Sequence, residues 1–188
     1  MRFVAIGLLL LGAAVASAAN IETDRLLNRI KSVSKEGAGN QEAQAAWKDL
    51  VGQGIDALFP RLNALDDASP LAANWLRSAV NAVVEKEKAA GKKLPADLLE
   101  AFVKDTKHSP TSRRIAYEIL TDVDPKTPER FLPGMLNDAS NELRRNAIAA
   151  ALKKAEKLEG DAAKSEYKRL FAAVRDEDQT KKIVEALK

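Results

Sequence analysis

Apolar residues recur at intervals of three and four positions along most of the chain, which is the spacing of one face of an α-helix. Clear examples are Leu26, Ile30 and Val33, and later Ile148 and Leu152. Such faces occur at residues 26–33, 43–51, 55–65, 71–84, 98–103, 115–120, 131–136, 143–152, 167–174 and 183–187. No segment alternates with period two, so we expect no strand. The pattern predicts an all-α fold of about ten helices, whose short links indicate antiparallel neighbours.

Four joints between these helices share one pattern: an apolar helix, a turn that carries Asp, a polar cap residue and a second amphipathic helix. The predicted caps are Ser69, Ser109, Ser140 and Asp178, at intervals of 40, 31 and 38 residues. A proline directly follows the first two, where a helix has an unbonded amide position to fill. Intervals of this size are typical of a two-helix repeat unit.

The first helix of this unit carries a proline in two of the four cases. The segments are Leu58-Phe59-Pro60 and Phe131-Leu132-Pro133, each ahead of the Asp turn. A proline inside a helix removes one hydrogen bond and its ring clashes with the preceding turn. We therefore expect a bend in the first helix at these positions.

These motifs resemble HEAT repeats, which have a proline in the first helix, Asp in the turn and basic residues early in the second helix. The best matches are FLPGMLNDASNELRRNAIAAAL (Phe131–Leu152) and ALFPRLNALDDASPLAANWLRSAV (Ala57–Val80), whereas residues 98–120 and 167–187 lack the proline. The resemblance covers most of the chain and implies an α-solenoid of antiparallel helix pairs. It divides the chain into a repeat domain at 47–188 and N-terminal helices at 20–46 that cap the stack. The resemblance extends to exported bacterial HEAT-repeat proteins.

The first residues, MRFVAIGLLLLGAAVASAAN, have the features of a secretion signal. Arg2 is followed by an apolar run from Phe3 to Val15 and by Ala16-Ser17-Ala18, whose small residues suit signal peptidase. The run is about half as long as a membrane-spanning helix requires, which makes an uncleaved anchor the weaker interpretation. We expect residues 1–18 to be a cleaved signal peptide and the protein to be periplasmic or secreted, without stable membrane insertion after cleavage.

Composition and charge exclude several classes of protein. The chain has no cysteine, so thiol nucleophiles, thiolate zinc sites and iron–sulfur clusters are excluded. The formal net charge is +3 and falls to +2 when Arg2 leaves with the signal peptide. So small a surplus does not indicate a polyanion partner, and few aromatic residues lie among the basic positions. Nucleic-acid binding is therefore the less favoured hypothesis.

Paired basic residues follow three of the predicted caps at nearly the same offset. They are Arg113-Arg114, Arg144-Arg145 and Lys181-Lys182. Stacked repeats would align them into a basic ridge that binds an acidic protein segment. The HEAT resemblance implies another role, in which one Arg of each pair bonds to a turn Asp of its own or the adjacent repeat. The candidate acceptors are Asp67, Asp105, Asp138 and Asp176. We favour this structural ladder and keep all six basic residues as partner-binding candidates.

The remaining polar residues do not indicate catalysis, a cofactor or a metal. Asp105, His108 and Ser109 lie within one short turn and cannot form a nucleophile–base–orienter chain. The carboxylate clusters are Asp66-Asp67, Asp122 with Asp124, and Asp176-Glu177-Asp178. All lie in predicted turns, where Asp commonly stabilises the turn or caps the next helix, and the last of them lacks the spacing of a calcium loop. We therefore predict no catalytic residue, no cofactor and no metal ligand.

These observations together predict an exported, non-enzymatic scaffold that binds a protein partner with an acidic segment along the groove of its repeats. The last helix, with Ile183, Val184 and Leu187, has no following repeat to cover it and could form a second contact or a homodimer. The alternatives are a helical-repeat module for a polyanion or nucleic acid, and an accessory region of an envelope enzyme.

Overall fold

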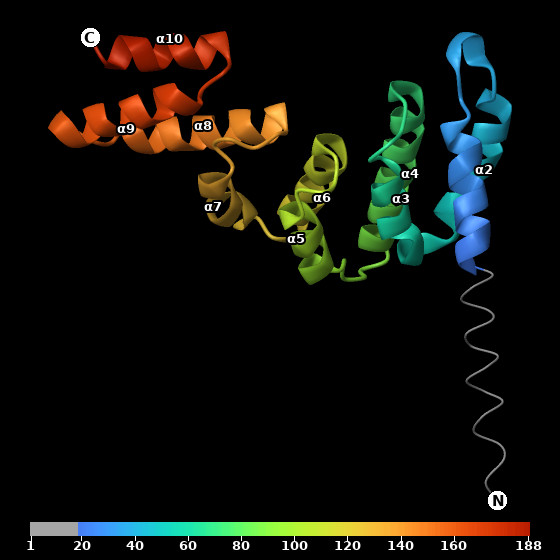
Figure 1. The fold of residues 1–188 in the computed structure, drawn as a ribbon. Coiled ribbons are helices and arrows are strands. Elements are labelled where there is room, and N and C mark those ends of the chain that lie inside the picture. The colour runs from blue at the N-terminus through green and yellow to red at the C-terminus, as the bar shows by residue number, and fades with distance from the viewer. Residues whose placement is uncertain (1–18) are drawn as a thin grey trace, which may run out of the picture. The chain divides into compact units, whose positions relative to one another are not determined.

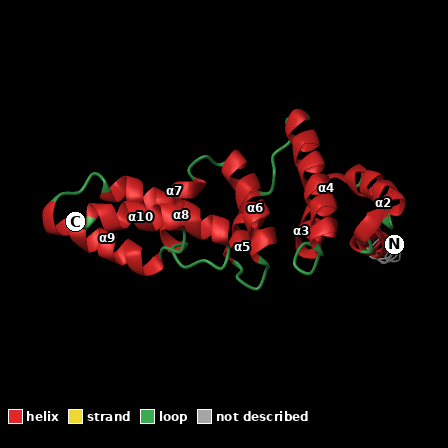
Figure 2. Ribbon diagram, turned by 90° about the horizontal axis from the view of Figure 1, so that it is seen from above, coloured by secondary structure: helices red, strands yellow, loops and turns green. Residues whose placement is uncertain are grey.

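Helices account for all the regular structure of residues 19–188. The computed structural model describes residues 19–188, so the predicted signal peptide (residues 1–18) lies outside the described residues. Ten α-helical segments and three short 3-10 helices follow one another in the described range, and no strand is present there. Figure 1 follows them in chain order, and Figure 2 shows the loops that join them. The all-α prediction is confirmed.

The chain divides into two compact units, the first ending at Pro95 and the second running from Ala96 to Lys188. The predicted boundary between residues 46 and 47 instead falls inside a helix of the first unit. Each unit has its own buried apolar residues, among them Ile30, Leu62 and Leu76 in the first and Leu120, Leu143 and Leu170 in the second. No helix in the described part of the chain is long and apolar enough to cross a bilayer.

The first unit packs its longest helix against two shorter ones. Its elements are a helix over residues 19–31, η1 (Lys35–Gly37), α2 (Asn40–Gly52), η2 (Gly54–Ala57), α3 (Leu58–Ala64) and α4 (Pro70–Ala89). The face of α4 that carries Leu76, Val80 and Val83 is fully buried, where α4 packs against α2 and α3. Gly39 precedes α2 with φ of 82°, a left-handed conformation that favours glycine.

A buried arginine connects α3 to the end of α2. Arg61 is completely buried and donates hydrogen bonds to the backbone oxygens of Gly54, at 3.1 Å, and of Leu50. Burial lowers the pKa of Arg61 to about 10, so the side chain remains charged at neutral pH. It thereby adds a second hydrogen bond to the Leu50 oxygen near the end of α2 and one to the Gly54 oxygen at the start of η2.

The second unit begins with α5 (Ala96–Lys104) and α6 (Pro110–Val123), which pack against each other. A short stretch of α7 (Thr127–Phe131) and η3 (Leu132–Gly134) follows. The unit ends with α8 (Asn141–Ala155), α9 (Gly160–Ala173) and α10 (Glu177–Ala186). In this unit α8 contacts α6, η3 and α9, and α9 contacts α10. Figures 1 and 2 both show α8 and α9 side by side.

Three of the four predicted helix caps are present. The hydroxyl oxygens of Ser69, Ser109 and Ser140 accept hydrogen bonds from the backbone N–H three residues later, at 3.2, 3.1 and 3.3 Å. The fourth prediction is wrong: α10 begins at Glu177, its cap position is Asp176, and Asp178 lies in the first turn. The carboxylate of Asp178 is held instead by an arginine of α8.

The two prolines lie in short helical segments, and neither bends a longer helix. Pro133 lies in the 3-10 turn η3, directly after α7 ends, so the predicted helix over residues 131–136 is only the end of α7 followed by η3. Pro60 lies in the first turn of α3, directly after η2. Proline is tolerated in a first turn because the N–H there has no helical partner.

Candidate functional site

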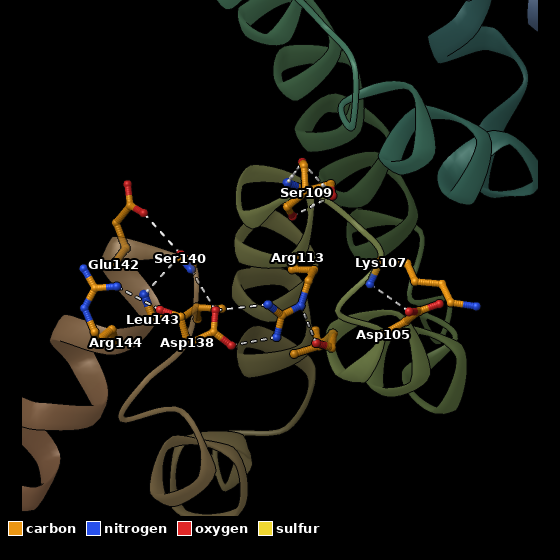
Figure 3. A network of polar contacts seen from close by, with 11 residues as sticks. Asp105, Lys107, Ser109, Arg113, Asp138, Ser140, Glu142, Leu143 and Arg144 are labelled. Carbon is orange, nitrogen blue, oxygen red and sulfur yellow. Dashed lines mark hydrogen bonds and ion pairs between the residues drawn. The ribbon is translucent and has the colours of Figure 1, made fainter. Parts of the chain in front are cut away.

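The joint between α6 and the turn before α8 is a buried ion pair. Arg113 Nη1 and Nη2 donate to Asp138 Oδ1 and Oδ2 at 3.0 and 2.8 Å, and both side chains are more than nine-tenths buried. Arg113 Nε donates to the backbone oxygen of Val103 at 2.9 Å. Figure 3 shows the guanidinium held between the Asp138 carboxylate and the end of α5. One planar side chain therefore connects three segments with well-oriented bonds.

Asp138 also shapes the turn that starts α8. Its Oδ1 accepts the backbone N–H of Ser140 at 2.8 Å, and its backbone oxygen accepts Arg144 Nη1 at the same distance. Ser140 in turn caps α8, so the carboxylate fixes both the incoming arginine and the start of the helix, as Figure 3 shows. Arg113 thus bonds to a turn Asp, as the ladder hypothesis predicts for one arginine of each pair.

A second joint connects α8 to α10 and lies at the surface. Arg145 Nη1 and Nη2 donate to the two carboxylate oxygens of Asp178 at 2.8 and 2.6 Å, and Nη1 is 3.1 Å from Asp176. The Asp178 side chain is 58% exposed, and its hydrogen bonds with Arg145 lower its pKa to about 2. The buried Gln179 donates from Nε2 to the Arg145 backbone oxygen at 2.9 Å. Arg145 is therefore a ladder residue as well.

The other predicted residues lie in separate environments. Arg144 bonds to Asp138 and Asn141 within its own turn. Lys181 pairs with Glu177 on the exposed side of α10 at 2.6 Å, and Lys182 is exposed. The remaining candidate acceptors have other donors: Asp67 accepts Lys31, and Asp105 accepts the backbone N–H of Lys107.

Arg114, the neighbour of Arg113, lines an open groove of about 520 Å³ between α6 and α8. Its Nε donates to Glu118 Oε1 at 2.9 Å, one turn further along the helix. Its Nη1 is shielded from solvent but has no hydrogen-bond partner among the described residues. The Arg114 side chain as a whole is 24% exposed, so it is accessible from the groove that it lines.

The α6–α8 groove, as we call this hollow, is lined by both polar and apolar side chains. From α6 it is lined by Tyr117 and Thr121, and from α8 by Asn146, Ala149 and Lys153. Pro128 and Leu132 also line it. Burial raises the pKa of Tyr117, so its hydroxyl is un-ionised at neutral pH. The groove thus offers amide and hydroxyl groups that donate and accept hydrogen bonds, together with cations of two helices. This combination suits a peptide backbone with acidic side chains.

Most of the groove residues are missed by sequence reasoning, although their spacing is visible in the chain. Arg114, Tyr117 and Thr121 are separated by three and four positions, as are Asn146, Ala149 and Lys153. Each set therefore lies on one face of its helix. The sequence does not show that these two faces line a common hollow. Of these six residues, only Arg114 is among the predicted partner-binding residues.

The single histidine of the chain has a packing role. The ring of His108 stacks on Phe102 with 3.8 Å between ring centroids, and Ser109 beside it caps α6. No group of three or more potential metal-binding side chains occurs within residues 19–188. The geometry therefore gives no support to a nucleophile or metal centre in this turn.

Removal of the Asp138 carboxylate should destabilise the protein strongly. Asp138→Ala leaves Arg113 buried without its counter-ion, and we expect a loss of about 3–5 kcal/mol in the free energy of unfolding. Urea denaturation monitored by circular dichroism measures this loss. Glu177→Ala, which removes the fully exposed pair with Lys181, is the control and should have little effect. Equal losses in the two variants would contradict a structural role for the Arg113–Asp138 pair.

The Asp178 carboxylate should titrate well below the ordinary Asp range. Its folded pKa of about 2 lies below the usual value of 3.8, so its contribution to stability is complete above the unfolded value. That contribution should be lost as the pH falls through the folded pKa. Carboxyl NMR titration should give a midpoint near 2 in the protein and a normal midpoint in Arg145→Gln. A normal midpoint in the unaltered protein would show that Arg145 is free of Asp178 in solution.

Comparison with known proteins adds no relative. No family model, no curated protein sequence and no solved structure matches the chain. The likeness to HEAT repeats therefore rests on the sequence motifs.

Proposed function

We propose that the protein is an exported, non-enzymatic binding module that holds an acidic segment of a partner protein in the α6–α8 groove. The observation that carries this proposal is Arg114. Of the two adjacent arginines on α6, Arg113 is buried and fully engaged in the fold, whereas Arg114 pairs only with Glu118 of its own helix and lies, 24% exposed, in a groove. A carboxylate of the partner that enters the groove would pair with that guanidinium.

The architecture that we propose for this module is a HEAT-like α-solenoid of antiparallel helix pairs. Three features support it. The capped turns at Ser69, Ser109 and Ser140 recur, Pro60 and Pro133 lie in the short helical segments before two of those turns, and Arg113 and Arg145 each bond to the turn before a later helix. In such a stack the second helices line the binding groove, as α6 and α8 do here.

The balance of charges in the groove favours one or two acidic residues over a polyanion. Arg114 and Lys153 line the groove together with Glu118 and Asp122, so cations and carboxylates are equal in number. A nucleic acid would place many phosphates against these carboxylates, which weakens that alternative. The accessory-enzyme alternative has no specific observation in its favour.

Two parts of the proposal rest on other segments. Export to the periplasm or the medium is supported by the signal-like residues 1–18. A homodimer or second contact through α10 is supported by Val184, which is 43% exposed, but its neighbours Lys181, Glu185 and Lys188 are charged. The α6–α8 groove is therefore the preferred binding surface.

Peptide selection tests the groove directly. A phage-displayed library of random 12-residue peptides is panned against the purified protein, and the selected peptides are titrated by fluorescence anisotropy. We expect Asp or Glu in the selected peptides and roughly tenfold weaker binding to Arg114→Gln, because a charge-assisted hydrogen bond contributes about 1.5 kcal/mol. Lys181→Gln, which alters an exposed cation on α10, should bind normally.

Two results would overturn the proposal. The first is undiminished affinity of the selected peptides for Arg114→Gln. The second is tighter binding of a single-stranded oligonucleotide than of any peptide, with a steep loss of affinity as salt rises, which is the signature of a polyanion site. Thermal unfolding of both variants verifies that any lost binding is not lost folding.

A further inference from the structure

A second hollow lies beside the groove, against the neighbouring face of α8, and its lining is mostly apolar. It has a volume of about 310 Å³ and lies where α8, α9 and the α7–η3 segment meet. Its apolar lining includes Leu132, Pro133, Leu136, Ala147, Ala150 and Ala151. We call it the alanine cleft. A volume of roughly 150 Å³ holds a benzene-sized group in an apolar cavity, so this cleft has room for about two aliphatic side chains.

The cleft is a consequence of two features of the sequence. Pro133 ends the first helix early, so that a single 3-10 turn stands against α8. Opposite it, α8 presents Ala147, Ala150 and Ala151, which are spaced by three and four positions on one helical face. Larger residues at these positions would fill the space from the α8 side. A broken helix opposite short side chains leaves apolar surface that a binding partner can cover.

The rim of the cleft carries balanced charge. Glu129 and Lys154 border it from α7 and α8, and Glu166 and Arg169 border it from α9. The last two form a bidentate pair, with 2.8 Å from Arg169 Nε and 2.5 Å from Nη2 to the Glu166 carboxylate. This pairing lowers the pKa of Glu166, which is therefore charged at neutral pH. Two carboxylates and two cations leave no net charge at the rim, so the rim gives no electrostatic preference for an anionic or a cationic group over an uncharged aliphatic one.

The alanine cleft adjoins the α6–α8 groove. Pro128, Leu132 and Ala150 line both hollows, so these three residues form the boundary between them. A segment lying in the groove can therefore extend over that boundary without crossing other parts of the fold. The groove contributes charged and polar side chains beside the apolar lining of the cleft, and such a combination is found in protein interfaces, where an apolar anchor lies beside polar contacts.

We propose that the alanine cleft holds two adjacent aliphatic side chains of the same protein segment whose carboxylate bonds to Arg114 in the groove. This inference rests on the proposed function and specifies its partner: a segment with an acidic residue followed or preceded by Leu-sized residues. The aliphatic pair supplies the apolar burial, and the carboxylate supplies the orientation.

Three alanines permit a matched test of the two hollows. Ala151→Met fills the cleft, Ala149→Met fills the groove from the same helix, and Ala172→Met adds the same side chain to an exposed position of α9. The probes are the 12-residue peptides selected on the unaltered protein, titrated by fluorescence anisotropy. We expect Ala151→Met and Ala149→Met each to weaken binding by tenfold or more, and Ala172→Met to leave it unchanged. We also expect two aliphatic residues beside the acid in the selected sequences.

The outcomes separate this inference from the proposed function. Loss of binding in Ala149→Met and Arg114→Gln with full binding in Ala151→Met would overturn the cleft while the groove stands. Loss in Ala151→Met with full binding in Arg114→Gln and Ala149→Met would overturn the groove and the link between them.

A measurement on the unaltered protein guards against misfolding of the variants. Alanine methyl groups labelled with ¹³C are followed by NMR during titration with a selected peptide. Shifts at Ala151 as well as Ala149 support the proposal, and shifts at Ala149 alone contradict it. If toluene shifts Ala151 and no peptide does, the occupant is a small apolar molecule and the proposal fails.

Discussion

The buried pair of Arg113 and Asp138 is the interaction on which the second unit depends. It joins the end of α5, the body of α6 and the turn before α8 through one guanidinium and one carboxylate. The attraction within such a pair adds little net stability, but its loss is costly, because either partner alone would be a buried, uncompensated charge. The position of α8 against α6 therefore depends on an ion pair whose two partners must both be present. The first unit uses another arrangement, in which the buried Arg61 bonds only to backbone oxygens.

Helix geometry explains why the adjacent residues Arg113 and Arg114 of α6 have different roles. Successive residues of an α-helix point about 100° apart, so Arg113 can face the turn while Arg114 faces the groove. On α8 the same geometry separates Ala149, which lines the groove, from Ala151, which lines the cleft. Two hollows thus flank the segment from Pro128 to Leu132. We regard them as parts of one binding surface, which the Arg113–Asp138 joint holds in shape.

Local features of this structure could be predicted from the sequence, and features that depend on which faces meet could not. The caps at Ser69, Ser109 and Ser140 depend on residues within one turn, and the structure confirms each. The sequence pattern also predicts a cap at Asp178, because its position resembles theirs, but Arg145, 33 residues earlier, holds its carboxylate. Tyr117 and Asn146 are not predicted as groove residues for the same reason, because the pairing of their helices across a groove is a tertiary property. Pro133 indicates a bend, while the structure shows a broken helix with a cleft beside it.

The most direct test compares the two neighbouring arginines in one measurement, the free energy of unfolding in urea. We predict that Arg113→Gln loses about 3 kcal/mol or more, because Asp138 is left buried without a counter-ion. We predict that Arg114→Gln changes by no more than about 1 kcal/mol, because its pair with Glu118 is partly exposed. Similar losses in the two variants would contradict the account, since Arg114 would then belong to the fold as much as Arg113 does.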